Sequence, residues 1–144
     1  MIKEIVWKDA ILAIIVPAGY SAEGIRFCTP SSFSQQLGYM NRPEGYVILP
    51  HEHNHVQRTI VWTQEVLLIR SGKVRLDMYE PGSHTYIESH ILLPGDVVLL
   101  AQGGHGLKML EPSEILEVKQ GPYAGDNDKT RYAAAPEEII RIRS

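Results

Sequence analysis

Short apolar runs, broken every few residues by Gly, Pro, Asn or Ser, are the feature that most constrains the fold of this chain. The clearest run, residues 73–79, alternates strictly between charged and apolar side chains, with Arg75 and Asp77 on the face opposite to Leu76. Successive residues of a strand point to opposite faces, so this pattern predicts a strand with one buried and one solvent-facing side. A series of such runs joined by tight turns predicts an all-β fold, an antiparallel β-barrel or jelly roll.

The chain shows no internal repeat and no low-complexity linker, which favours one domain over residues 1–144. We expect strands over residues 2–7, 11–16, 35–40, 45–50, 59–70, 73–79, 86–93, 96–100, 105–110 and 115–119. Residues 133–143 are expected to form a short C-terminal helix or tail, because Pro136 stands near the first turn, with acidic residues early and basic residues late.

Charge and cysteine content narrow the class of protein. The net charge is -3, so the chain offers no basic patch and nucleic acid is not an expected partner. Charged residues interrupt the first nine positions, and the apolar run 10–16 is too short to span a bilayer, so no membrane is expected either. The single cysteine, Cys28, excludes an internal disulfide framework and suits a reducing compartment. We expect a cytoplasmic protein.

Two histidines follow the strand-like run 45–50. His51 and His53 are two positions apart, and on an extended strand residues at i and i+2 point to the same side. Two imidazoles that point to one place are a starting geometry for a metal site.

Two further candidates share a face with apolar residues. Glu65 has the parity of Leu67 and Ile69, and His105 has the parity of Leu107 and Met109. A buried Glu is costly unless it is paired or bound to a metal. Each residue alone is more commonly structural, but three His and one Glu on inward faces indicate a site for a divalent first-row ion with open positions.

The spacing of these residues resembles the cupins, a family of small jelly-roll barrels. Five residues separate Gly45 from His51-Glu52-His53, and six residues separate Glu65 from Gly72, as in the first cupin motif. The chain departs from the family in two places: eleven residues separate His53 from Glu65, and the segment from Gly95 to His105 lacks the Pro of the second motif. The resemblance covers residues 45–110.

The cupin resemblance implies a set of metal ligands, with Zn, Fe, Mn or Ni as the ion. The implied ligands are His51, His53, Glu65 and His105. Because the insertion precedes Glu65, Gln64 or His55 remains an alternative for the completing ligand, and a shifted pair, His53 and His55, is also open.

A second resemblance lies in residues 115–132, which are similar to the closing segment of cupin-type mannose-6-phosphate isomerases and of small cupins associated with surface-sugar biosynthesis. The matching residues are Glu117, Val118, Gly121, Tyr123, Gly125, Asp128 and Arg131. This resemblance implies a metal-dependent isomerase or epimerase of a sugar, sugar phosphate or nucleotide-linked sugar in carbohydrate or polysaccharide biosynthesis. The structural alternative is a last strand, a Gly-Pro turn and a polar tail that seals the barrel edge.

Other residues are weaker candidates. Glu65 and Lys119, which has the parity of Glu117, are candidates for moving a proton. Arg58 could hold a substrate phosphate or carboxylate, or could be a surface charge. Tyr46 and Tyr123 could line a sugar pocket.

The sequence also allows two alternative functions and suggests a dimer. The same ligand set suits a non-haem iron dioxygenase, and a cupin can also bind metal or sugar without catalysis. Residues 66–69 are apolar on both faces, so they are covered either by another sheet or by a second subunit. We expect a homodimer, in which the N-terminal strands are candidates for exchange.

Overall fold

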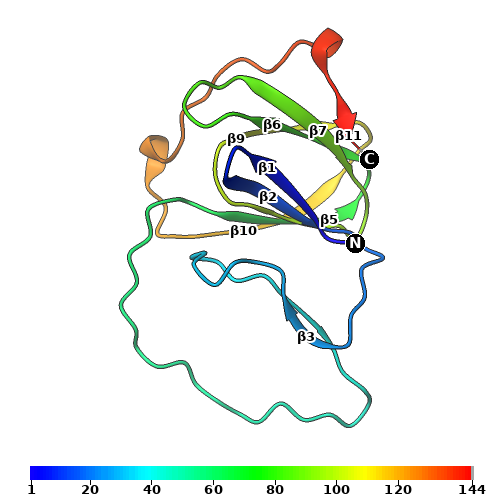
Figure 1. The fold of residues 1–144 in the computed structure, drawn as a ribbon, viewed down its shortest axis with the longest axis vertical. Helices are drawn as coiled ribbons and strands as arrows, with labels where there is room; N and C mark the ends of the chain where they lie inside the picture. Colours follow the sequence, from blue (N-terminus) through cyan, green and yellow to red (C-terminus); the bar gives the residue numbers. More distant parts are fainter. Residues whose placement is uncertain (144) are drawn as a thin grey trace.

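The strands of this protein build two facing sheets and a separate hairpin (Figure 1). The structure, a computed structural model, describes residues 1–143 apart from the side chain of Asn127. The strands are β1 (Lys3–Trp7), β2 (Ala10–Val16), β3 (Gly24–Phe27), β4 (Gly38–Asn41), β5 (Glu65–Ser71), β6 (Val74–Tyr79), β7 (Tyr86–Leu92), β8 (Val97–Leu100), β9 (Gly104–Met109), β10 (Glu114–Lys119) and β11 (Ile142–Arg143). Two 3-10 turns are η1 (Gly125–Asp128) and η2 (Glu137–Ile139), and residues 1–143 contain no α-helix.

The prediction of an antiparallel all-β fold is confirmed. The five-stranded sheet has the order β1-β2-β8-β5-β10, and all its neighbours are antiparallel. The four-stranded sheet has the order β11-β7-β6-β9, in which only β11 runs parallel to its neighbour. Strands β3 and β4 pair only with each other. Within residues 1–143 the hydrogen-bonded ladders leave two separate sheets and do not close a barrel.

The core lies between the two sheets, because both contribute their apolar faces to it. The buried cluster is Ile5, Leu12, Ala13, Ile15, Leu67, Ile69, Val74, Leu76, Met78, Leu92, Val98 and Leu100. The inward set expected on β6 is thus correct. Each fully buried side chain of this kind contributes about 1.5–3 kcal/mol to folding, so this layer is the main source of stability.

The outward face of β6 is buried as well, which the alternating pattern did not predict. Arg75 and Asp77 are only 5% and 4% exposed. The C-terminal tail covers them: Glu137 accepts hydrogen bonds from both terminal nitrogens of Arg75, at 2.7 and 3.2 Å. The prediction of a solvent-facing side for β6 is therefore wrong, since a segment more than sixty residues away covers it.

The C-terminal segment is a tail and not a helix. Of the two conformations expected for residues 133–143, a short helix or a tail, the structure has the tail, in which only η2 and the short β11 are regular. The backbone of this segment pairs with β7 instead. The backbone N–H of Ser89 donates to the carbonyl of Arg141 at 2.9 Å, and Ile142 pairs with Ser89. A helix of this length is marginal without tertiary packing, so pairing with β7 decides the conformation. No helix within residues 1–143 is long and apolar enough to cross a membrane.

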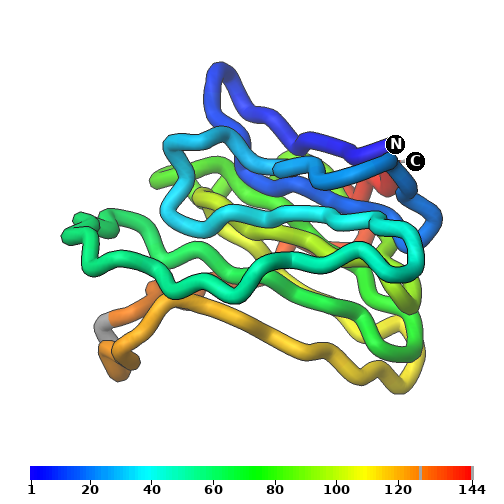
Figure 2. The backbone as a smooth tube through the Cα atoms, turned by 90° about the horizontal axis from the view of Figure 1, so that it is seen from below, coloured from blue at the N-terminus to red at the C-terminus, as the bar shows by residue number. Residues whose placement is uncertain are grey.

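Residues 42–64, which we call the arm, connect β4 to β5 without regular structure. The expected strand at 45–50 is wrong, and of the strand expected over 59–70 only the part from Glu65 is formed. The segments 45–50 and 59–64 contain apolar, strand-like residues, but no strand pairs with them among residues 1–143, and Leu49 is 77% exposed. The arm leaves the sandwich on the side of the five-stranded sheet, and Figure 2 shows it in cyan and teal across the face seen from below.

Candidate functional site

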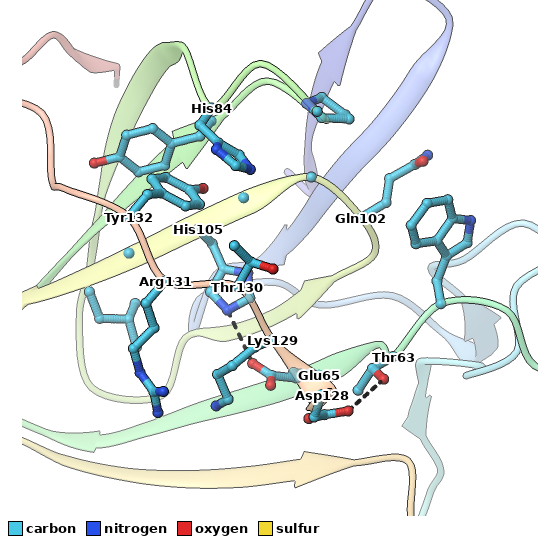
Figure 3. Close-up of a pocket in the computed structure, with 18 of the residues that line it drawn as sticks. Thr63, Glu65, His84, Gln102, His105, Asp128, Lys129, Thr130, Arg131 and Tyr132 are labelled. Atoms are coloured by element: carbon cyan, nitrogen blue, oxygen red, sulfur yellow. Dashed lines mark hydrogen bonds and ion pairs between the residues drawn. The ribbon is translucent and has the colours of Figure 1, made fainter. Parts of the chain in front are cut away.

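Glu65 and His105 meet at one end of the space between the two sheets. Glu65 opens β5 and shares its inward face with the buried Leu67. His105 lies near the start of β9, opposite Met78 of β6. The Nε2 atom of His105 is 3.2 Å from Oε2 of Glu65, and the two side chains come from opposite sheets (Figure 3). The structure thus brings together two of the four ligands implied by the sequence.

The surroundings of Glu65 keep its carboxylate ionised at neutral pH. The hydrogen bond with His105 lowers the pKa of Glu65 below its ordinary value, while burial acts in the opposite direction. The positive charges of Lys119 and Lys129 lower this pKa further. An ionised carboxylate accepts hydrogen bonds and protons, so Glu65 is already in the form that a general base requires.

A pocket of about 990 Å³ opens over this pair. Its walls include Trp62 and Thr63 from the end of the arm, Gln102 and Gly103 from the β8–β9 loop, and the segment from Asp128 to Ala134. Thr63 donates from its hydroxyl to Oδ1 of Asp128 at 3.4 Å, which links the two sides of the opening. A volume of this order accommodates a small organic ligand.

One wall of the pocket is aromatic. The rings of His84 and Tyr132 stack with centroids 4.0 Å apart and planes 8° from parallel. His84 has φ of 60°, a left-handed conformation that is uncommon for residues other than Gly, and its imidazole lies against Tyr132 of the tail. The hydroxyl of Tyr132 is buried without a hydrogen-bond partner among the described residues, and burial raises the pKa of this group.

Charged side chains of both signs line the pocket, because the carboxylates of Glu65, Glu117 and Asp128 lie there together with Lys129 and Arg131. Lys129 and Arg131 line the pocket, and in the part of the chain that the structure describes neither forms an ion pair with a carboxylate. Lys119 lies outside the lining, with Nζ 3.3 Å from Glu117 and 4.0 Å from Glu65. The hydrogen bond to Glu117 is the main cause of the raised pKa of Lys119, so this amine stays protonated and is a poor base.

His51 and His53, the first two implied ligands, lie away from the pair of Glu65 and His105. His51 and His53 are exposed on the arm, with ring centroids 5.5 Å apart, and Nδ1 of His51 is 2.9 Å from the carbonyl of Leu49. Among the described residues no group of three His, Cys, Asp or Glu side chains is placed to hold a metal ion. Of the four implied ligands, a single copy of the chain therefore brings only Glu65 and His105 together.

The alternative ligands are also apart from the pair. The amide oxygen of Gln64 accepts hydrogen bonds from the Ser34 hydroxyl at 3.1 Å and the Gln35 backbone at 3.0 Å, on the face of β5 opposite to Glu65. His55 is exposed on the arm.

The three residues proposed to contact substrate do not line the pocket. Arg58 contacts the carbonyl of its near neighbour Val56, Tyr46 lies under the guanidinium of Arg42, and Tyr123 is exposed beside η1. The structure assigns the pocket walls instead to His84, Gln102, Lys129 and Tyr132, which sequence reasoning did not select. For the remaining walls only the closing segment carried a usable signal, because Glu117, Asp128 and Arg131 were among its matching residues and all three line the pocket.

Comparisons with known proteins identified no relative. No family model, no curated protein and no solved structure matches this chain.

Proposed function

We propose that the protein is a cupin-type jelly-roll domain that binds a sugar-derived small molecule in the pocket over Glu65 and His105 and acts on it as an isomerase or epimerase. The observation that carries the proposal is the 3.2 Å contact between these two side chains at the base of a ligand-sized pocket. Two facing antiparallel sheets are the architecture of a jelly roll, which supports the cupin assignment.

The proposed chemistry is proton transfer next to a carbonyl. The ionised Glu65 carboxylate can take a proton from the carbon next to the substrate carbonyl, which leaves an enediolate, and the resulting carboxylic acid can return that proton to the same or the neighbouring carbon; the imidazole of His105 beside it can donate a hydrogen bond to the enediolate oxygen. Lys129 and Arg131 on the rim suit an anionic group such as a sugar phosphate, and the guanidinium offers a bidentate fork for it. Trp62 and Tyr132 offer apolar faces to a sugar ring.

The cupin resemblance implies a divalent ion, but the described residues of one copy of the chain do not present enough ligands to hold one. Zinc and similar ions in catalytic sites take about three protein ligands, and the pair supplies one oxygen and one nitrogen. We therefore assign the proton transfer to Glu65 and His105 and no step to a metal.

Solvent deuterium exchange into sugars and sugar phosphates tests the proposal. We expect exchange at the carbon beside the carbonyl of at least one member of a broad panel, and a loss of about 10²–10⁴-fold in the Glu65→Gln variant. Glu114→Gln is the matched control, because Glu114 is an exposed carboxylate on β10 away from the pocket. If a sugar phosphate binds but no deuterium is exchanged, the protein is a non-catalytic sugar-binding domain and not an enzyme. If neither binding nor exchange is found, the proposal is overturned.

A further inference from the structure

A second, smaller pocket of about 390 Å³ lies beside the pocket over Glu65 and His105. Its walls come from the base of the arm, from the loop between β3 and β4, and from the residues directly after β8. Three residues line both pockets: Val61, Trp62 and Gln102. The two pockets therefore adjoin, and one ligand can reach from the larger pocket into the smaller one.

The smaller pocket differs from the larger one in its charge. The larger pocket is lined by charged residues of both signs, among them Glu65 and Lys129. Among the described residues, no Asp, Glu, Lys, Arg or His lines the smaller pocket. Its polar residues are all uncharged: Ser32, Ser34, Thr59, Gln64 and Gln102. An ion would give up its water there without gaining a counter-charge, so the smaller pocket suits an uncharged ligand.

Gln64 is a buried residue with a hydrogen-bond donor that no protein group uses. It is only 5% exposed and lines the smaller pocket. Its Oε1 atom accepts from the Ser34 hydroxyl at 3.1 Å and from the backbone N–H of Gln35 at 3.0 Å. A backbone N–H only donates, so these contacts fix the orientation of the amide, and its Nε2 group has no hydrogen-bond partner among the described residues. An unpaired N–H in so enclosed a place is costly, and an acceptor oxygen of a ligand would pair it.

The rest of the wall offers the other contacts that a sugar ring makes. The Nε2 group of Gln102 donates to the carbonyl of Ile11 at 3.4 Å, and the amide oxygen accepts no hydrogen bond from the residues that the structure describes. The hydroxyl of Thr59 can both donate and accept. Phe33 and Trp62 add aromatic surface. A sugar ring uses both kinds of contact, because its rim carries hydroxyl groups and its faces are hydrocarbon.

We propose that the smaller pocket binds an uncharged sugar ring, so that the ligand of this protein is an anionic sugar joined to a neutral one. The volume of about 390 Å³ is near the lower end of the range of ligand pockets, roughly 300–1,000 Å³, which suits one ring and not a longer chain. The larger pocket then holds the sugar that reacts, and the smaller pocket selects its glycosides over the free sugar. The place of the reacting sugar rests on the proposed function, whereas the binding of a neutral ring does not.

Extension of a sugar phosphate by one neutral ring tests the proposal. Calorimetry compares glucose 6-phosphate with three ligands that add one glucose ring to it: maltose 6′-phosphate, cellobiose 6′-phosphate and trehalose 6-phosphate. We expect at least one of the three to bind about tenfold or more tightly than glucose 6-phosphate, because the second ring adds hydrogen bonds and aromatic contact. Three extended ligands that bind no more tightly than glucose 6-phosphate would overturn the proposal.

Gln64→Glu removes the unpaired donor and keeps an oxygen that accepts from Ser34 and Gln35. We expect the gain in affinity from the second ring to fall below about threefold in this variant. The matched control is Gln120→Glu, because Gln120 bonds to Ser34 and to the backbone of Gln64 but lines neither pocket, and the change adds the same charge. The control should keep the gain. Equal gains in the two variants would overturn the proposal, and if Gln64→Glu does not fold, Thr59→Val at an exposed position of the same pocket replaces it.

Selective carbon-13 labelling of phenylalanine locates the second ring, because the chain has only Phe27 and Phe33. Nuclear Overhauser effects should join the neutral ring to Phe33 and not to Phe27. Uncharged maltose, cellobiose or trehalose at high concentration should give the same contacts with Phe33. These contacts without any binding of glucose 6-phosphate would remove the proposed function and leave the smaller pocket as a sugar site.

Two results of the same labelling experiment would overturn the proposal. The first is that no neutral ring contacts Phe33. The second is that uridine diphosphate glucose contacts Phe33 through its base while no neutral sugar does, which would assign the smaller pocket to a nucleobase.

Discussion

Arg75 and Asp77, two residues apart on β6, form a buried bidentate ion pair: Nε donates to Oδ1 at 2.7 Å and Nη2 donates to Oδ2 at 3.0 Å. Both side chains are only 6% exposed. Glu137 of the tail accepts from the same guanidinium, and Lys108 of β9 donates to Glu137 at 2.6 Å. This network fastens the tail to the outer face of the four-stranded sheet.

The attachment of the tail should depend on pH. Hydrogen bonds from Arg75 and Lys108 hold the pKa of Glu137 at about 2, below its ordinary value of 4.5. Because the folded-state pKa is lowered, this contribution to stability is complete above pH 4.5 and is lost as the pH falls toward 2. In thermal unfolding at pH 7, the wild type should have a higher midpoint temperature than Glu137→Gln. This difference in midpoint should disappear as the pH falls from 4.5 to 2. The neighbouring Glu138→Gln should follow wild type throughout, and a gap that persists at low pH would contradict the assignment.

Gly72 should tolerate no side chain. It has φ of 84° in the β5–β6 turn, and a Cβ there would overlap the carbonyl oxygen of Pro112. We expect Gly72→Ala to lower the free energy of unfolding by more than about 3 kcal/mol, from backbone strain and overlap together. Gly82 has a similar φ of 82° with open space around it, so Gly82→Ala should cost only about 1 kcal/mol. Urea unfolding measures both, and equal losses would show that the overlap is relieved by a shift of the Pro112 loop.

Gly104 should be essential to the aromatic wall of the pocket. A Cβ on Gly104 would overlap the hydroxyl of Tyr132, whereas a Cβ on Gly106 would meet only Cε2 of Tyr79 at 3.7 Å. We expect Gly104→Ala to destabilise the protein by about 2 kcal/mol and to weaken sugar-phosphate binding, while Gly106→Ala does neither. Adding Tyr132→Phe to Gly104→Ala should recover part of the stability, because it removes the overlapping hydroxyl. Calorimetry of unfolding and binding gives both values, and a neutral Gly104→Ala would contradict the contact.

Asp96 should hold the β7–β8 turn against the loop after β2. Its two carboxylate oxygens accept hydrogen bonds from the backbone N–H groups of Ala18 and Leu93, each at 2.8 Å. Asp96→Ala leaves both groups without a partner in a largely buried place, so we expect a loss of about 3 kcal/mol. Asp96→Asn keeps one acceptor and should lose about half as much. Denaturant unfolding of the two variants measures their free energies of unfolding, which should fall from wild type to Asp96→Asn to Asp96→Ala.

The candidate site was partly predictable because its two central residues follow a local rule. Glu65 has the strand parity of the buried Leu67 and Ile69, and both Glu65 and His105 lie on inward faces as the parity of their strands predicts. His84, Gln102 and Tyr132 carried no such signal, since they lie in a turn, a loop and the tail, where no period relates sequence position to direction. Their convergence on one pocket depends on the packing of segments that are distant in the sequence.

The sequence by itself determined those strands in which alternation and turn residues act over a few positions: residues 73–79 were correctly assigned to a strand from their period of two. Only the tertiary structure decided what covers each strand. The tail buries Arg75 and Asp77, and the strand-like segment 45–50 remains unpaired within one copy. The reason is physical: a strand is stabilised by hydrogen bonds to a neighbouring strand, and no local pattern specifies which neighbour, or which copy of the chain, provides it.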